Sequence, residues 1–341
     1  MAITRPERVT QRKIAELAGV SQATVSLVLN GKTDSTTRIP EETRQRVLEV
    51  IRETTYVADP AARSLAGVGN NLVGIFTYEH AFPNESSDFY TPLLMGIESA
   101  AESVGVDLLM FTSAPVTDGR RRLFHEKNRL RLADGCLLLG REMDSDELAR
   151  LVATGYPFVA VGRRDGDSIP YVGVDYVTAT ATLTRKALDA GHKNFLYLHL
   201  PLTAESTRDR LEGVAREVDA AGVTLQTLST DDLSSAWAAV RDSGSTVLFV
   251  EDPTQAAALY DIAAADGVRV PDGISMVVLG ERTRPSAAGA DFTRLVAPRP
   301  ELGSRAVELL DQIMNRGGAE TTQVLLDCII VDGSTLAEVA R

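Results

Sequence analysis

The polar and small side chains between residues 10 and 30 have the types and spacing to read the edges of DNA bases. Thr10 and Ser21 each stand before a short apolar pattern at helical spacing, where a hydroxyl can accept a hydrogen bond from an unpaired backbone N–H. Gln22, Ala23, Ser26 and Leu27 follow in the first turns of the second pattern. The start of a recognition helix is the part that meets base edges, so these residues are candidates for DNA contact.

Two short helices must position these side chains. Each carries apolar residues at helical spacing, as Ile14, Leu17 and Ala18 in the first and Val25, Val28 and Leu29 in the second. The break at Gly19-Val20 is too short for antiparallel helices, and Gly19 permits the left-handed backbone of a sharp corner. The same pattern also fits a generic helical hairpin on a protein surface, so spacing alone leaves both interpretations open.

Charge is distributed unevenly along the 341 residues. The formal net charge is −12 at pH 7, which by itself argues against a nucleic-acid partner. Residues 1–67, however, hold 10 Lys and Arg against 8 Asp and Glu, whereas the rest of the chain holds 25 against 39. A slightly cationic head on an acidic body suits a protein whose head alone touches phosphate.

Length and composition indicate a globular protein of two or three domains. Hydrophobic residues make up 44% and charged residues 24% of the chain, which is enough for a sizeable core. No apolar run approaches ~18 residues, and the polar N-terminus lacks the apolar core of a signal peptide, so we expect a cytoplasmic protein without membrane contact. Cys136 and Cys328 lie singly in apolar runs and are expected to be core residues.

A third helix and a linker follow the helix pair. Residues 31–39 are polar and rich in Gly, Thr and Ser, which predicts a loop, and Pro40 then opens a helix whose apolar face completes a three-helix core. Residues 56–67 include a helix after Pro60 that is too short to be stable alone. This segment is either a plain linker or a hinge that becomes helical on DNA and wedges Leu65 into the minor groove.

From residue 71 onward, apolar runs alternate with amphipathic stretches. The runs predict buried parallel strands at residues 72–77, 106–112, 135–139, 158–161, 171–174, 194–199, 246–250 and 275–279. The stretches predict helices at residues 91–104, 146–154, 177–190, 209–221, 233–242 and 254–266, followed by a helix at 301–315 and a strand at 323–331. Repeated βα units give a doubly wound α/β fold, and their number favours two lobes with a ligand cleft between them.

Motifs for catalysis or metal binding are absent from the sequence. Gly67-Val68-Gly69 precedes its strand instead of following it, and no phosphate-binding loop, HExxH, CxxC or GxSxG is found. The four histidines stand singly; His192 follows Gly191 at a helix end, where a cationic ring would favour the helix dipole. Asp144 and Asp146 occupy helix-start positions typical of caps. We therefore expect no enzyme, no catalytic residues, no metal and no cofactor.

Residues 9–30 resemble the helix-turn-helix of the LacI-type transcription regulators, the lactose- and galactose-repressor family. The family pattern Val-Thr-x-x-x-Val/Ile-Ala-x-x-Ala-Gly-Val-Ser-x-x-Thr-Val-Ser-x-Val-Leu-Asn is met at nearly every fixed position. Residues 40–44 and 62–65 match its third helix and hinge. The resemblance continues over essentially the whole chain, for example through residues 208–213 and 270–275.

The resemblance implies a domain order and a function. It predicts a helix-turn-helix DNA-binding domain at residues 1–57, a hinge helix or linker at 58–70, and a two-lobed, periplasmic-binding-protein-like body for effector binding and dimerisation at 71–341. Lobe 1 is expected at about 71–173 and 295–318, and lobe 2 at about 174–294 and 319–341. The family default is a homodimeric repressor of a near-palindromic DNA operator, controlled by a sugar or sugar derivative bound between the lobes.

The resemblance also assigns DNA-binding residues. Side chains that hold phosphates or cap helices are expected at Thr10, Ser21, Thr24, Ser26 and Asn30, base-facing side chains at Gln22, Ala23 and Leu27, and further contacts at Tyr56, Ala62 and the wedge Leu65. An arginine is common in the family at the position of Leu27. Its absence removes a guanine contact worth ~1–3 kcal/mol, so we expect an operator with different outer bases.

The effector pocket implied by the resemblance departs from the family. Its expected contacts are Phe89, Tyr90, Arg163, Ser206, Arg210, Glu251 and Asp252. Gly162 and Gly280 stand where the family usually has aspartate, and Glu251 replaces an asparagine, so two carboxylates that would bind sugar hydroxyls are missing. A sugar remains the default, but the altered set leaves the ligand class open, including an effector whose acidic group pairs with Arg210.

Two rival functions share parts of this pattern. A periplasmic sugar-binding protein has a similar body, but it needs an export signal and no helix-turn-helix. A βα enzyme needs a catalytic constellation, which the sequence does not display. Both therefore fit the chain less well than a DNA-binding regulator does.

Overall fold

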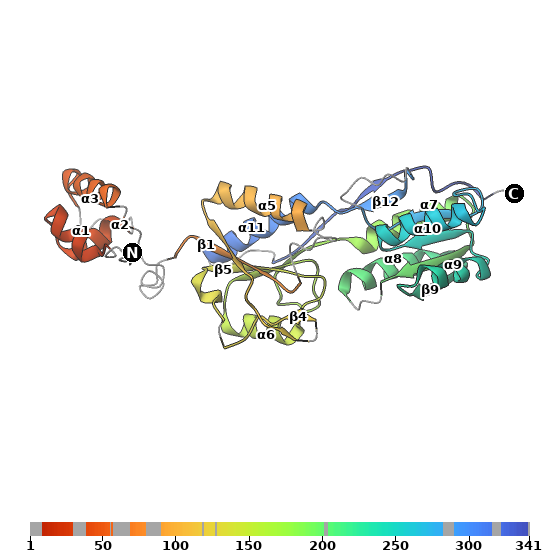
Figure 1. Cartoon of the computed structure of the whole chain (residues 1–341), viewed down its shortest axis with the longest axis horizontal. Helices are drawn as coiled ribbons and strands as arrows, with labels where there is room; N and C mark the ends of the chain where they lie inside the picture. The colour runs from red at the N-terminus through yellow and green to blue at the C-terminus, as the bar shows by residue number, and fades with distance from the viewer. Residues whose placement is uncertain are drawn as a thin grey trace, which may run out of the picture. The chain divides into compact units, whose positions relative to one another are not determined.

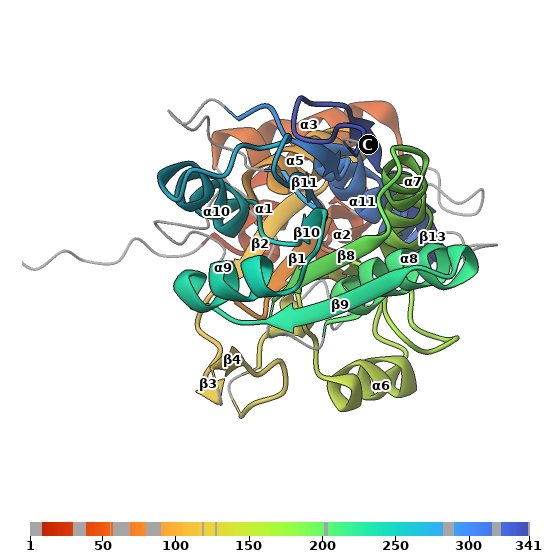
Figure 2. The same cartoon turned by 90° about the vertical axis from the view of Figure 1, so that its right-hand side faces the viewer.

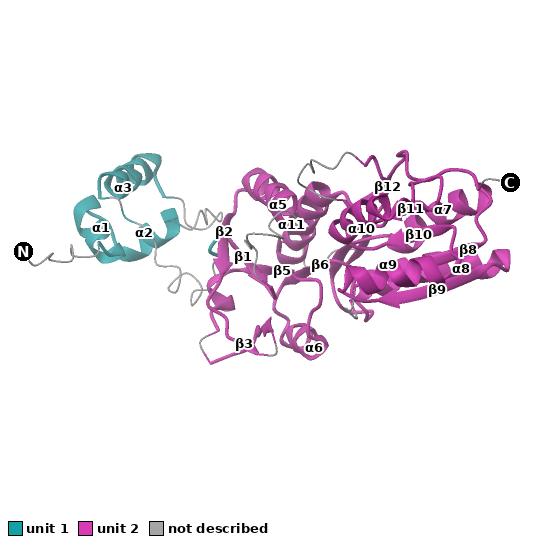
Figure 3. Ribbon diagram, turned by 45° about the vertical axis from the view of Figure 1, so that its right-hand side comes forward, with its two compact units in different colours: residues 1–70 teal, residues 71–341 magenta. Residues whose placement is uncertain are grey.

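The structure is a computed structural model of the chain, drawn in Figure 1 and, after a quarter turn, in Figure 2. It describes residues 9–29, 39–54, 56, 69–79, 90–117, 119–126, 128–200, 204–281, 290–315 and 322–339. Residues 1–70 and 71–341 form two compact units, shown in teal and magenta in Figure 3.

The described part of the first unit contains three helices, α1 (Gln11–Ala18), α2 (Gln22–Leu29) and α3 (Glu41–Glu53). The Thr10 hydroxyl accepts a hydrogen bond from the Lys13 N–H at 3.3 Å, and the Ser21 hydroxyl accepts one from the Thr24 N–H at 3.1 Å. Gly19 ends α1 with φ of 65°, a left-handed backbone that favours glycine. The caps and the sharp corner predicted from the sequence are therefore confirmed.

A small core joins these three helices. Ile14, Val25 and Val47, one from each helix, are completely buried and belong to one apolar cluster. The Arg46 Nε of α3 donates to the Ala18 carbonyl oxygen at the end of α1, at 3.0 Å. The third helix thus closes the predicted three-helix core.

Lobe 1 of the second unit is built on a parallel sheet. Its strands run in the spatial order β13-β7-β6-β5-β1-β2. Their bounds are β1 (Leu72–Thr77), β2 (Asp107–Phe111), β5 (Gly135–Leu139), β6 (Phe158–Val161), β7 (Tyr171–Val174) and β13 (Gln323–Leu326). A short antiparallel pair, β3 (Val116–Thr117) with β4 (Arg120–Arg121), and the turn η1 (Leu130–Leu132) lie in the connection from β2 to β5.

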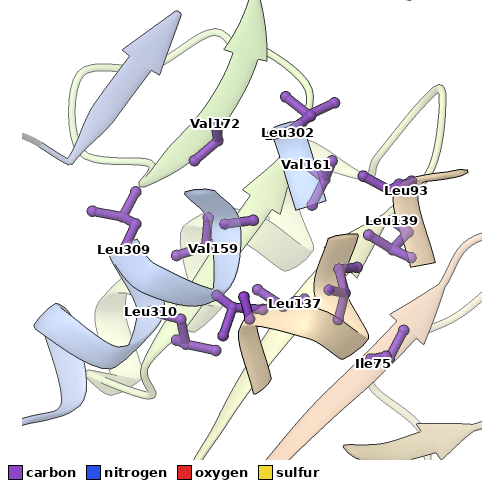
Figure 4. Close-up of a cluster of buried hydrophobic side chains, with 14 of the residues drawn as sticks. Ile75, Leu93, Leu137, Leu139, Val159, Val161, Val172, Leu302, Leu309 and Leu310 are labelled. Carbon is purple, nitrogen blue, oxygen red and sulfur yellow. The ribbon is translucent and has the colours of Figure 1, made fainter. Parts of the chain in front are cut away.

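Helices cover both faces of the lobe 1 sheet. Helices α5 (Tyr90–Val104) and α11 (Arg299–Asn315) pack on one face over Leu137 and Leu139 of β5, and Figure 4 shows this cluster. The intervening Cys136 and Leu138 face the other side, where α6 (Ser145–Thr154) packs. The strands read as nearly continuous apolar runs because both faces are buried.

Lobe 2 repeats this arrangement. Its sheet has the order β14-β12-β11-β10-β8-β9, and every pair is parallel except β12 with β14. The bounds are β8 (Asn194–His199), β9 (Thr224–Ser229), β10 (Val247–Val250), β11 (Ser275–Val278), β12 (Thr293–Val296) and β14 (Ile329–Val331). One face packs on α7 (Tyr176–Asp189) and α8 (Glu205–Ala221), and the other on α9 (Leu233–Asp242) and α10 (Pro253–Ala265).

Several features of this body differ from the sequence prediction. The single strand expected at 323–331 is two strands, because the chain leaves the lobe 1 sheet after β13 and joins the lobe 2 sheet as β14. The assignment of 319–341 to lobe 2 is therefore wrong for β13, which pairs with β7. Edge strand β9 was missed because four of its six residues are exposed and polar. Strand β12 was not predicted either, and α8 begins four residues earlier than expected.

Among the described residues, no helix is both long enough and apolar enough to cross a membrane.

Candidate functional site

A cavity of about 300 Å³ lies between the two lobes of the second unit. Its lobe 1 wall includes Leu139, Val161 and Val174, the last residues of β5, β6 and β7. Its lobe 2 wall includes Glu251 and Gly280, just beyond β10 and β11. Doubly wound sheets bind small molecules at this carboxyl edge of their strands.

The structure brings six of the seven candidate effector contacts to this cavity. The residues that line it are Tyr90, Arg163, Ser206, Arg210, Glu251 and Asp252. Phe89 lies outside the described residues. The lining also contains three arginines that were not singled out in the sequence, Arg141, Arg164 and Arg299.

Arg210 is held rigidly in the lobe 2 wall. Its guanidinium carbon lies 3.6 Å from the centre of the Tyr176 ring, a cation–π contact. Its Nε donates to the Leu279 carbonyl oxygen at 3.1 Å, and its Nη1 donates to the Ser206 carbonyl oxygen at 3.0 Å. A guanidinium that is stacked and anchored in this way is preorganised to bind a ligand.

Glu251 is surrounded by donors of its own lobe. Its Oε1 accepts from the Thr207 hydroxyl at 2.7 Å and from Arg210 Nη1 at 3.3 Å, and its Oε2 accepts from the Tyr197 hydroxyl at 3.3 Å and the Leu200 N–H at 3.4 Å. A carboxylate has about four acceptor positions, and this one is only 6% exposed. Glu251 is therefore placed to position Arg210 rather than to bind a sugar hydroxyl.

Asp252 and Tyr90 are also held by neighbouring groups. Oδ1 of Asp252 caps α10 by accepting from the Thr254 and Gln255 N–H groups at 2.7 and 2.9 Å. The Tyr90 hydroxyl donates to Glu79 Oε2 at 2.8 Å, and burial, with a smaller contribution from Glu79, raises the pKa of Tyr90. Tyr90 is thus a neutral wall residue of the cavity at neutral pH.

Arg163 forms a bidentate ion pair with Asp209 across the cleft. Its Nε and Nη2 donate to the two carboxylate oxygens of Asp209 on α8, both at 2.6 Å, and its Nη1 donates to Asp165 at 2.8 Å. The hydrogen bond with Asp209 raises the pKa of Arg163. Since Arg163 follows β6 in lobe 1 and Asp209 belongs to lobe 2, this arginine joins the lobes.

Two more ion pairs join the same two segments. Arg164 Nη1 donates to Glu205 Oε2 at 2.8 Å, and Arg208 Nη2 donates to Asp165 Oδ2 at 2.5 Å. We call these three pairs the interlobe clasp: Arg163–Asp209, Arg164–Glu205 and Arg208–Asp165. The sequence displays the charges in residues 163–165 and 205–209, but it gave no signal that the two segments meet.

In the first unit, the candidate DNA-binding residues divide by exposure. Gln22 and Ala23 are exposed at the start of α2, whereas Thr24, Ser26 and Leu27 are half-buried. Tyr56 packs against the small core of this unit. Asn30, Ala62 and Leu65 lie outside the described residues. The exposed start of α2 is the surface that a DNA groove could meet.

The described residues contain no group of acids, histidines and cysteines that could hold a metal ion. Cys136 is buried in the lobe 1 sheet, and burial raises its pKa, while burial raises the pKa of Cys328 to about 12. Both thiols are therefore protonated at neutral pH.

Comparison with known protein families finds a match in each of the two units. Residues 10–59 match the model of bacterial regulatory proteins of the lacI family, and residues 184–336 match a periplasmic binding protein-like domain. The chain belongs to the LacI family. This LacI-family chain is 28% identical over 335 residues to the HTH-type transcriptional regulator CelR of Thermobifida fusca, covering 94% of the chain and 95% of that protein.

Other relatives of this LacI-family chain are also transcriptional regulators. Catabolite control protein A of Priestia megaterium is 26% identical, with 93% of the chain and 96% of that protein covered. The sucrose operon repressor of Klebsiella pneumoniae is 32% identical over 223 residues, with 65% of the chain and 64% of that protein covered. The chain is accordingly a DNA-binding transcriptional regulator, and its relatives are not enzymes.

Solved structures share the fold of this LacI-family chain. The lac repressor dimer bound to operator and an anti-inducer has a TM-score of 0.76 at 21% identity, with 97% of this chain and 100% of that chain covered. The CelR–cellobiose complex has a TM-score of 0.66 at 23% identity, with 96% of this chain and 100% of that chain covered. The helix-turn-helix and two-lobed fold predicted from the sequence is confirmed.

Proposed function

We propose that this protein is a homodimeric repressor that binds a near-palindromic operator and changes its operator affinity when a sugar or sugar derivative occupies the interlobe cavity. The observation that carries the proposal is one chain that holds both a capped helix-turn-helix, whose second helix is exposed at its start, and a cavity walled by two lobes. The solved lac repressor dimer on its operator and the CelR–cellobiose complex support the choice of DNA and sugar.

The mechanism that we propose is a shift between two populations. An effector that contacts both lobes favours one lobe arrangement, and in a dimer this arrangement sets the spacing of the two hinge segments. The hinge segments at 58–70 then form or lose their DNA contacts. Residues Ala62 and Leu65 are our candidates for these contacts, with Leu65 as the minor-groove wedge.

Selection from random DNA duplexes tests the DNA-binding half of the proposal. The purified full-length protein should enrich a near-palindromic sequence, and Leu65→Ala should weaken binding to that sequence far more than it weakens effector binding. Failure to enrich any duplex, with or without candidate metabolites, would contradict the proposal. Equal operator affinity of the wild type and Leu65→Ala would remove the wedge role alone.

A further inference from the structure

Five guanidinium groups line the interlobe cavity, and they fall into two sets. Arg163 and Arg164 are engaged by carboxylates of α8 in the interlobe clasp. The other three, Arg141, Arg210 and Arg299, come from three separate parts of the wall: the residues after β5, helix α8 and the start of α11. This second set offers guanidinium donors to a molecule in the cavity.

The three arginines of the second set lie close enough to influence one another. Arg299 is only 9% exposed, and its Nη2 donates to the Glu281 carbonyl oxygen at 3.2 Å. Burial lowers the pKa of Arg299, and the positive charges of Arg210 and Arg141 lower it further, against the opposing effects of Tyr176 and Glu281. Three like charges around one cavity repel one another, and an anion placed among them would relieve that repulsion.

Three of the four carboxylates that line the cavity already accept hydrogen bonds. Asp209 accepts two hydrogen bonds from Arg163, and Glu251 is saturated by four donors. Asp252 caps α10, and Glu281 lies 3.8 Å from Arg294 Nε. The cavity therefore has more donor capacity to offer a ligand than acceptor capacity, because a guanidinium carries five N–H groups and the hydrogen bonds of Arg210 use only its Nε and Nη1.

Backbone dipoles act in the same direction. Helices α8, α10 and α11 begin at the cavity, where Ser206, Thr254 and Arg299 of their first turns line it. Ala204 precedes α8 and provides no side-chain cap for its first N–H groups. Helix N-termini carry a partial positive charge and stabilise anions, so they add to the field of the arginines.

The backbone conformation at Gly162 disfavours an aspartate side chain at this position of the lobe 1 wall. Its φ is 107°, a conformation that side-chain-bearing residues rarely adopt, and a Cβ there would lie 3.2 Å from Arg164 Nη2. This wall cannot easily supply the acceptor that a sugar hydroxyl would need. Gly280, on the lobe 2 wall, leaves more room, because a Cβ there would meet no atom closer than 3.4 Å.

We propose that the effector carries an anionic group, a carboxylate or a phosphate on a sugar-sized molecule, and that Arg210, Arg299 and Arg141 bind this group. The proposal rests on the proposed function, because it takes the interlobe cavity to be the effector site. Guanidinium groups bind both kinds of anion through paired, charge-assisted hydrogen bonds.

Calorimetric titration of the full-length protein with acidic sugars, their neutral parents and two neutral disaccharides tests this proposal. The acidic probes are glucuronate, galacturonate, gluconate and a glucose monophosphate, and the neutral probes are glucose, galactose, cellobiose and sucrose. At least one acidic probe should bind about 10-fold or more tightly than its neutral parent, and its affinity should fall as potassium chloride is raised. Preference for a carboxylate or for the phosphate identifies the anion. Tighter binding of a neutral probe, or binding of none, overturns the proposal.

Two variants locate the anion site. Arg141→Gln removes the positive charge of an exposed side chain. It should weaken binding of the acidic probe about 10-fold, with little effect on folding. Gly280→Asp adds a carboxylate to the cavity lining and should weaken binding of the acidic probe by a similar factor. Gly280→Ala measures the steric part of that change. Unchanged affinity for the acidic probe in both Arg141→Gln and Gly280→Asp would contradict the assignment.

Operator binding separates the failure of this inference from the failure of the proposed function. If a neutral sugar alone binds the cavity and alters operator affinity, the proposed function stands and the anionic effector is rejected. If the acidic probe binds the cavity while the protein enriches no duplex, the anion site stands and the repressor function is rejected.

Discussion

Arg163 and Arg210 both line the interlobe cavity, but their surroundings give them different tasks. The guanidinium of Arg163 donates hydrogen bonds to Asp209 and Asp165. The guanidinium of Arg210 instead stacks on the Tyr176 ring and is one of four donors to the Glu251 carboxylate. The sequence suggested both as effector contacts because of their place in the family pattern. Their partners could not be predicted, because Arg163 and Asp209 are far apart in sequence and meet only when the two lobes are placed.

Leu27 is expected to determine base preference. It lies half-buried on α2, beyond the exposed Gln22 and Ala23. The variant Leu27→Arg should gain a guanine contact and shift the preferred base at one operator position by about 1–3 kcal/mol of discrimination. Selection from random duplexes with the wild type and the variant measures this shift. An identical preferred sequence for both proteins would show that Leu27 does not face the bases.

His192 predicts a pH-dependent stability. The ring is buried; Nε2 donates to the Ala337 carbonyl oxygen at 3.1 Å, since a carbonyl only accepts, and Nδ1 then accepts from the Thr246 hydroxyl at 2.9 Å. Burial lowers its pKa below the ordinary 6.5, against a smaller raising effect of the Ala337 bond. His192 is therefore neutral, and the cationic ring that its position at a helix end suggested is wrong.

The unfolded chain takes up this proton at a higher pH than the folded chain does. The contribution of His192 to the free energy of unfolding should thus be complete above pH 6.5. It should decrease as pH drops from there to the lowered pKa, by at most about 1.4 kcal/mol per pH unit. Denaturant unfolding at several pH values measures the slope, which His192→Gln should reduce. His125→Gln, at a half-buried position, is the control. An unchanged slope in His192→Gln would reject this role.

Helix α8 connects the cavity to the lobe contact. Its first two turns carry Glu205, Arg208 and Asp209 toward lobe 1, and Arg210 lies beside them on the cavity wall. A movement of lobe 1 against lobe 2 must therefore change the clasp and the ligand site together. We infer that clasp strength contributes to the closed lobe arrangement.

Breaking the strongest pair of the clasp tests this inference. Asp209 is 4% exposed, and Asp209→Asn removes one of the two acceptors that hold Arg163, which should lower the free energy of unfolding by about 1–3 kcal/mol and weaken ligand binding. In a cycle with Arg163→Met, the double variant should lose less than the two single losses together. Asp332→Asn breaks the exposed Lys186–Asp332 pair and should change stability by about 0.5 kcal/mol or less. Additive losses at Arg163 and Asp209 would contradict the clasp.

Elements with two buried faces were the easiest to predict. The strands β1, β5, β6, β7 and β8 have the bounds that their apolar runs suggest, because both faces pack against helices. Edge strand β9 has four exposed polar residues among its six, so it lacks that run. The division of 323–331 into β13 and β14 follows from the placement of the two sheets, which no local pattern encodes.

The two lobes share the chain, and this sharing couples them. The backbone passes from lobe 1 to lobe 2 between β7 and α7, returns between β12 and α11, and passes again between β13 and β14. Three covalent connections permit the lobes to tilt about a common region while the cavity opens or closes. The family motif in residues 9–30 predicted the regulator, while the interlobe chemistry required the folded body.

Operator affinity measured against cavity occupancy tests the central claim most directly. Fluorescence anisotropy with the selected duplex and the full-length protein gives the operator Kd with and without a saturating cavity ligand. We predict a change of about 10-fold, within the usual range of allosteric coupling, that is lost in Arg210→Ala while ligand-free operator affinity is kept. A ligand that saturates the cavity by calorimetry and leaves the operator Kd unchanged would contradict the account.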